Sequence, residues 1–172
     1  MARPAKPTSR TSLRFVSPDD TAIGFEPGSD EHSAAWREYS ETFDERKLNL
    51  TSVPAYYYLK ILSLDAQQKF MDTWRAADED DARSPLERMF SHECLTATRE
   101  FIETNLVGCD DHPEVTDITP DGEMVTRSFV WKPGTPRPDG LVDSVLADQI
   151  LAFNLIMFSI NTNRLSEKEK KH

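Results

Sequence analysis

The pattern of hydrophobic and polar positions changes period near residue 29. Two short apolar runs, residues 13–16 and 21–25, flank a turn at residues 17–20 and predict a first β-hairpin. Ser29 is suited to cap a helix that begins with two acidic residues. The large side chains that follow recur at helical spacing and predict one buried face, made of Trp36, Tyr39, Phe43 and Leu50.

Three adjacent tyrosines, Tyr56, Tyr57 and Tyr58, open an apolar run over residues 56–62 that fits either a short helix or a strand. Neither structure points three consecutive side chains in one direction, so at least one tyrosine is expected to be partly exposed. Exposed tyrosines are common interface anchors, and we take Tyr57 as a candidate partner-binding residue. A base-stacking role is disfavoured because no cation neighbours the tyrosines in the sequence.

Two helices are expected in the middle of the chain. Residues 64–77 carry apolar side chains on one side and run into the acidic residues 78–81, which predict a solvated loop. Ser84, Pro85 and Glu87 form the sequence of a capping box with proline in the first turn. An apolar stripe then predicts one continuous helix that Gly108 ends.

The last third of the chain predicts a hairpin, a connector and a helix. Residues 115–131 surround a Pro-Asp-Gly turn and indicate a hairpin, and residues 132–140 hold three prolines and indicate an extended connector. The helix over residues 141–161 is apolar on nearly every side in its second half, which indicates burial either in the core or between subunits. Its candidate partner-binding residues are Phe153, Ile156, Met157 and Ile160.

These elements predict an α+β fold with four to five helices and a small antiparallel sheet built from two hairpins. A chain of 172 residues is most simply one domain. We expect a basic arm at residues 1–14, one globular domain at residues 15–163 and a charged tail at residues 164–172.

Charge is unevenly distributed along the chain. The arm contains no acid and carries four cations, Arg3, Lys6, Arg10 and Arg14. The tail has a net charge of +2, so a total of −10 leaves −16 for residues 15–163. A cationic arm on an anionic body predicts docking on another subunit of a homo- or hetero-oligomer. Contact of the arm with nucleic acid is a weaker expectation, because the acidic body repels phosphates.

Two groups of residues have the composition of a metal or catalytic site. His92, Cys94, Cys109 and His112 have zinc-ligand types, but residues two apart on a helix point away from each other, so no metal site is predicted. The loop at residues 109–114 holds Asp110, Asp111 and His112, which could bind a hard divalent ion or do acid–base chemistry.

No phosphate loop, dinucleotide fingerprint or nucleophile elbow is present, and we predict neither an enzyme nor a cofactor. The expected function is a non-enzymatic protein-interaction or assembly module, of the kind found among viral and phage structural or assembly proteins. Two alternatives remain open: an acidic inhibitor or decoy of a nucleic-acid-binding protein, and a metal-dependent enzyme centred on residues 109–114. Two cysteines, no signal-peptide pattern and no membrane-length apolar run predict a cytoplasmic protein, or a virion component, without a membrane partner.

Overall fold

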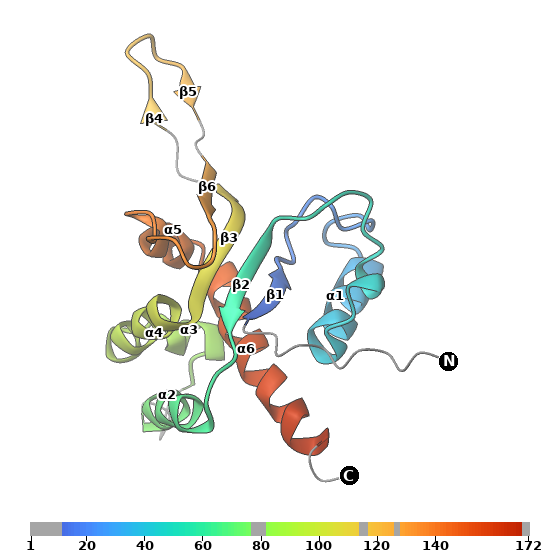
Figure 1. Cartoon of the computed structure of the whole chain (residues 1–172), viewed down its shortest axis with the longest axis vertical. Coiled ribbons are helices and arrows are strands. Elements are labelled where there is room, and N and C mark those ends of the chain that lie inside the picture. Colours follow the sequence, from blue (N-terminus) through green and yellow to red (C-terminus); the bar gives the residue numbers. More distant parts are fainter. Residues whose placement is uncertain (1–11, 77–81, 114–116, 126–127, 170–172) are drawn as a thin grey trace.

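The computed structural model describes residues 12–76, 82–113, 117–125 and 128–169. Within them the chain is α+β, with six helices, a four-stranded antiparallel sheet and a separate two-stranded hairpin (Figure 1). In chain order the elements are β1 (Ser12–Val16), α1 (Asp30–Thr42), the short 3₁₀ helix η1 (Glu45–Leu48), β2 (Tyr56–Lys60), α2 (Leu64–Ala76), α3 (Pro85–Met89), α4 (His92–Asn105), β3 (Leu106–Pro113), β4 (Asp117–Ile118), β5 (Met124–Val125), β6 (Ser128–Trp131), α5 (Leu141–Ala147) and α6 (Gln149–Glu169).

The four-stranded sheet has the order β1-β2-β3-β6, so β1 pairs with β2 rather than with residues 21–25. The prediction of a strand at residues 21–25 is therefore wrong. The carboxylate of Asp20 accepts hydrogen bonds from the backbone N–H groups of Ala22 and Ala55, each at 2.8 Å. These bonds fold the segment after β1 into a loop that is fastened to the start of β2.

The second expected hairpin is divided between two sheets. β4 pairs with β5 around a turn in which Gly122 has a φ of 81°, and this small hairpin lies away from the helices (Figure 1). β6 returns to the body and pairs with β3. The main sheet is consequently built by strands from four parts of the chain, and the prediction that it consists of two hairpins is wrong.

The expected helix from Ser84 to Gly108 is two helices followed by a strand. The capping box is confirmed, because Ser84 Oγ accepts from the Glu87 N–H and Glu87 Oε2 accepts from the Ser84 N–H. The chain then breaks at Ser91, where the backbone is extended, and Thr98 Oγ1 donates to the freed Met89 carbonyl at 2.8 Å. Gly108 lies in β3, where an added Cβ would be 2.9 Å from the Trp131 carbonyl oxygen.

The last helix is also divided, into α5 and α6, which meet at an angle of 100°. Asp148 caps α6 at the bend, with its Oδ1 accepting from the Leu151 N–H at 3.0 Å. Among the described residues, no single helix is long and apolar enough to cross a membrane; only the bent pair of α5 and α6 passes that test, by length and composition.

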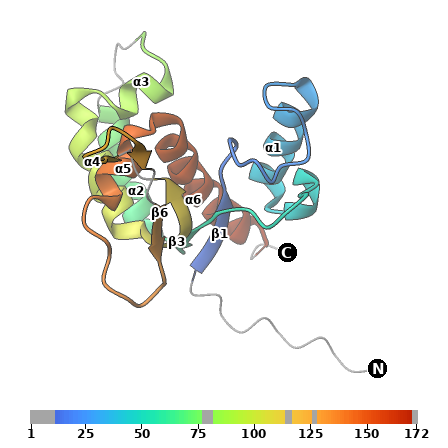
Figure 2. The same ribbon diagram turned by 90° about the horizontal axis from the view of Figure 1, so that it is seen from above.

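α6 is the central helix of the core. Its buried residues include Leu155, Ile156 and Phe158, and the Phe158 ring contacts Phe15 of β1 at a centroid distance of 5.0 Å. Seen from above, α6 lies between α1 on one side and the group of α2, α4 and α5 on the other (Figure 2). The sheet therefore has one face packed on α6, and its other face contains the more exposed side chains.

Candidate functional site

The outward face of the sheet carries a compact group of aromatic and charged side chains. We call it the tyrosine face and define it as Arg14 of β1, Glu45 of η1, Tyr56 and Tyr58 of β2, and Asp110 of β3. Side chains alternate along a strand, so Tyr56 and Tyr58 share this face and are half-buried. The prediction that at least one of the three tyrosines is partly exposed is confirmed by these two.

Each exposed tyrosine is paired with a carboxylate. Tyr56 donates its hydroxyl hydrogen to Glu45 Oε2 at 2.9 Å, and Tyr58 donates to Asp110 Oδ2 at 3.1 Å. The two rings lie 6.4 Å apart between centroids. Partial burial, together with the nearby carboxylates, raises the pKa of both tyrosines, so both hydroxyls remain protonated donors.

Arg14 belongs to the same group. Its guanidinium carbon lies 4.5 Å from the centroid of the Tyr56 ring, and its Nη2 lies 2.9 Å from Glu45 Oε1. Glu45 therefore already faces a cation, whereas Asp110 forms no ion pair with any described residue. Tyrosine and arginine are enriched among residues that dominate protein interfaces, and an unpaired exposed carboxylate attracts a cation.

The predicted partner-binding residues that the structure describes do not lie together on one surface. Tyr57, the candidate partner-binding tyrosine, points into the core and is 4% exposed, so it is not available at the surface of this chain. On α6, Phe153 and Met157 are half-buried, while Ile156 and Ile160 are buried in the core of the same chain. Of the four cations assigned to the arm, Arg14 lies in β1 and the other three, Arg3, Lys6 and Arg10, lie outside the described residues.

The segment at residues 109–113 is part of β3 and not a loop after a helix. His112 is 2% exposed, with Nδ1 at 2.8 Å from the Tyr57 hydroxyl and Nε2 at 2.9 Å from Ser144 Oγ. Burial lowers the pKa of His112, which favours a neutral ring. Asp110 and Asp111 are exposed, and His112 points into the core.

The candidate metal ligands also lie apart. In the part of the chain that the structure describes, no three His, Cys, Asp or Glu side chains are close enough to hold a metal ion. His92 is exposed and Cys94 is buried, although the helix break before them removes the continuity that we expected there. Burial raises the pKa of the Cys109 thiol to about 11, so this thiol is a poor nucleophile.

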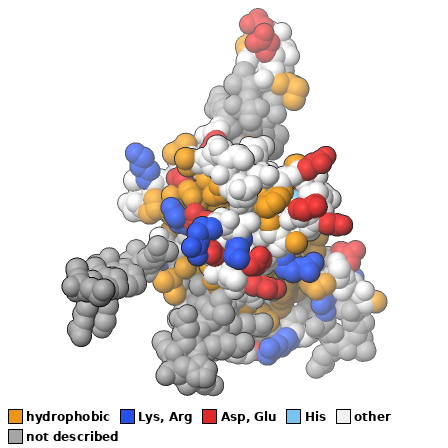
Figure 3. All heavy atoms as spheres, turned by 90° about the vertical axis from the view of Figure 1, so that its right-hand side faces the viewer, with side chains coloured by type: hydrophobic (Ala, Val, Ile, Leu, Met, Phe, Trp, Pro, Cys, Tyr) orange, Lys and Arg blue, Asp and Glu red, His pale blue; other side chains and the backbone are white. Residues whose placement is uncertain are grey.

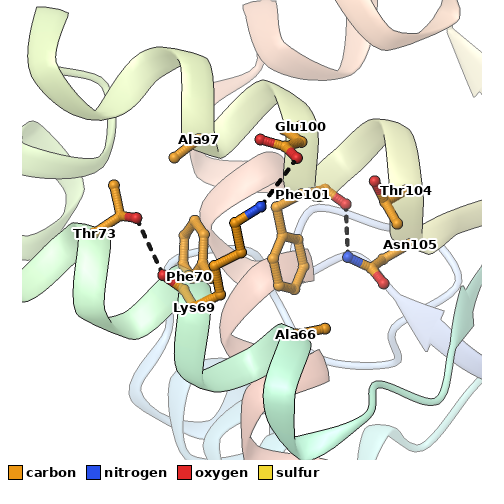
Figure 4. A pocket seen from close by; sticks show the side chains of 9 residues that line it. All are labelled: Ala66, Lys69, Phe70, Thr73, Ala97, Glu100, Phe101, Thr104 and Asn105. Atoms are coloured by element: carbon orange, nitrogen blue, oxygen red, sulfur yellow. Dashed lines mark hydrogen bonds and ion pairs between the residues drawn. The ribbon is translucent and has the colours of Figure 1, made fainter.

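A small cleft of about 240 Å³ separates α2 from α4 (Figure 4). Its apolar side is formed by Phe70 and Phe101, whose ring centroids are 4.8 Å apart. Lys69 reaches across from α2 toward Glu100 of α4, with 3.8 Å between Nζ and Oε1. The cleft has room for a small apolar group, but its two charges already face each other.

The residues of the tyrosine face differ in how far the sequence indicates that they lie together. Alternation along a strand indicates that Tyr56 and Tyr58 share a face, once residues 56–60 are taken as a strand. Glu45 and Asp110 come from distant segments, and no sequence spacing links them to the tyrosines. No protein-family model matches the chain, and no curated protein or solved structure matches it either, so the tyrosine face is identified from its geometry alone.

Proposed function

We propose that this protein is a non-enzymatic protein-interaction and assembly module, in which the basic arm of one copy binds the acidic body of another. The observation that carries the proposal is the tyrosine face, where two half-buried tyrosines lie beside an exposed carboxylate that no described cation neutralises. This combination of aromatic area and uncompensated charge is suited to a cationic peptide.

The charge distribution also supports binding of the arm of one copy to the body of another. Arg14 is fixed in β1 by Glu45, which leaves Arg3, Lys6 and Arg10 as the cations of the arm before the first strand. Residues 15–163 carry a net charge of −16, so the attraction between an arm and a body is long-ranged at low salt.

The buried position of α6 makes the arm the main element of the proposal. Leu155, Ile156 and Ile160 are at most 1% exposed within one chain, so these three side chains offer no free apolar surface to a partner. Association through the arm and the sheet requires no rearrangement of the core.

Neither alternative function gains a specific observation. The acidic residues 78–81, which an inhibitor or decoy of a nucleic-acid-binding protein could use to imitate phosphates, lie outside the described residues. Acidic side chains do gather at the tip of the β4–β5 hairpin, but lysine and arginine side chains are mixed with acidic ones near the middle of the face shown in Figure 3.

The proposal is tested by reversing the charge of the arm. We expect the variant Arg3→Glu, Lys6→Glu, Arg10→Glu to lose the assembled species in light scattering after size-exclusion chromatography, with an unchanged circular dichroism spectrum. The matched control is Lys168→Glu, Lys170→Glu, Lys171→Glu, which changes the net charge equally and should keep the native mass. A native chain that is monomeric at low salt, or an arm variant that assembles normally, contradicts the proposal.

A further inference from the structure

We infer that the tyrosine face is the acceptor site for the arm, and that it binds residues 3–7 of a second copy in a polyproline II conformation. The inference rests on the proposed function and adds to it the binding site and the bound segment. The Tyr58–Asp110 pair is the principal anchor.

The arm has the sequence of a polyproline II ligand. Residues 3–7 read Arg-Pro-Ala-Lys-Pro and therefore contain two cation–proline pairs, three residues apart. This helix has three residues per turn, so Pro4 and Pro7 lie along one edge and Arg3 and Lys6 along the next. A residue before proline already favours extended backbone, which reduces the entropy lost on binding.

The tyrosine face has the complementary chemistry. It presents two tyrosine–carboxylate pairs, and proline-rich segments bind by packing their rings on aromatic side chains. The carboxylates can accept the cations that precede each proline. Because Arg14 lies over the Tyr56 ring and neutralises Glu45, the pair with the greater capacity for a new cation is Tyr58 with Asp110.

Binding on the face is favoured over addition of a fifth strand at the β1 edge of the sheet. The hydroxyl oxygen of Tyr39 accepts from the Val16 N–H at 3.2 Å, and the same hydroxyl lies 3.4 Å from the Arg14 carbonyl, to which it donates. The backbone groups of β1 that an added strand needs are thus already bonded at these two positions.

The direction of β1 favours the arm of a second copy over the chain's own arm. Ser12 pairs with Lys60, whereas Arg14 pairs with Tyr58 and Val16 with Tyr56, so the arm leaves the sheet at the end away from the tyrosines. Followed backwards to Ser12, β1 points away from Tyr56 and Tyr58, so it does not direct its own arm toward them. An arm from another copy is not subject to this constraint.

The inference is tested with a fluorescent peptide of residues 1–11 and full-length receptors. Each receptor carries Arg3→Glu, Lys6→Glu and Arg10→Glu, so that its own arm does not compete. We expect receptors with an added Asp110→Lys or Tyr58→Ala to bind the peptide about tenfold more weakly in fluorescence anisotropy. The matched control is Asp111→Lys, an equal charge change at the next exposed position, which should alter the affinity by less than about threefold. A peptide with Pro4→Ala and Pro7→Ala keeps its charge and should bind about tenfold more weakly.

The outcomes separate this inference from the proposed function. Equal weakening by Asp110→Lys and Asp111→Lys, or equal binding of the proline-free peptide, shows attraction by the overall field and overturns the acceptor site alone. Asp110 is exposed, so its substitution tests the site even if Tyr58→Ala disturbs the sheet. If the peptide binds no receptor and the native arm instead binds a single-stranded oligonucleotide, the acceptor site is overturned. Native assembly by the charge-reversed arm contradicts the proposed function itself.

Discussion

At the scale of single residues, His112 is a buried side chain whose protonation the fold disfavours. Its ring is buried between the Tyr57 and Ser144 hydroxyls and stacks on Phe129 at a centroid distance of 6.2 Å. Burial lowers the pKa of His112 more than the negative charges of Asp148 and Asp111 raise it. In the folded chain the ring therefore stays neutral below the pH at which a free histidine takes up a proton.

This lowered pKa predicts loss of stability in mild acid. Below about pH 6.5, the ordinary pKa of histidine, the unfolded chain binds a proton that the folded chain excludes. The free energy of unfolding therefore decreases as the pH is lowered. We expect His112→Gln to reduce this fall between about pH 7.5 and about pH 5, because glutamine does not bind a proton in this range. Urea denaturation of both chains at the two pH values measures the difference. His92→Gln, at an exposed position of α4, is the control, and an equal pH effect in both variants contradicts the prediction.

At the scale of elements, local sequence signals predicted those parts of the fold that local interactions determine. The helix α2 and the capping box at Ser84 are confirmed, whereas the connector at residues 132–140, which we expected to be extended, contains turns with positive φ at Gly134 and Gly140. The breaks at Ser91 and Asp148 were missed because they depend on contacts between elements, such as the bond from Thr98 to the Met89 carbonyl.

The candidate site was only partly predictable for the same reason. Arg14 and the presence of exposed tyrosines followed from charge and from the alternation of side chains. Tyr57, the tyrosine chosen as a candidate partner-binding residue, is buried, because the sequence does not say which face of β2 packs on the core. Asp110 joins Tyr58 only because β3 pairs with β2, through a register that places Gly108 opposite Tyr58.

The position of α6 gives a prediction at the same scale. Leu155→Ala removes a fully buried side chain, so it should lower the free energy of unfolding by about 2–5 kcal/mol. Ile150→Ala, in the exposed first turn of α6, should cost less than about 1 kcal/mol. Urea denaturation at two protein concentrations measures both effects. A loss for Leu155→Ala that appears only at the higher concentration means that α6 is stabilised by a second chain, contrary to its place in the core.

At the scale of the whole molecule, the core and the proposed contact surfaces are separate. α6 and the inward face of the sheet form the core, while the tyrosine face is on the opposite side of the same strands. Substitutions on the tyrosine face can therefore change association without removing core contacts. The same separation would let the proposed association respond to solution conditions that leave the fold intact.

Salt concentration is the condition that should distinguish association between chains from the stability of the fold. Between about 0.01 M and about 1 M salt, the screening length falls from about 30 Å to about 3 Å, so the attraction between arm and body is lost except at direct contact. Burial of apolar side chains is not weakened by this screening. We therefore expect the assembled mass in sedimentation velocity to decrease with salt while the unfolding midpoint changes little. The variant with a charge-reversed arm should show no such decrease, because it has no favourable arm contact to lose. Assembly that strengthens with salt would instead indicate apolar contacts, for which Met124 and Val130 are exposed, and would exclude the arm as its main source.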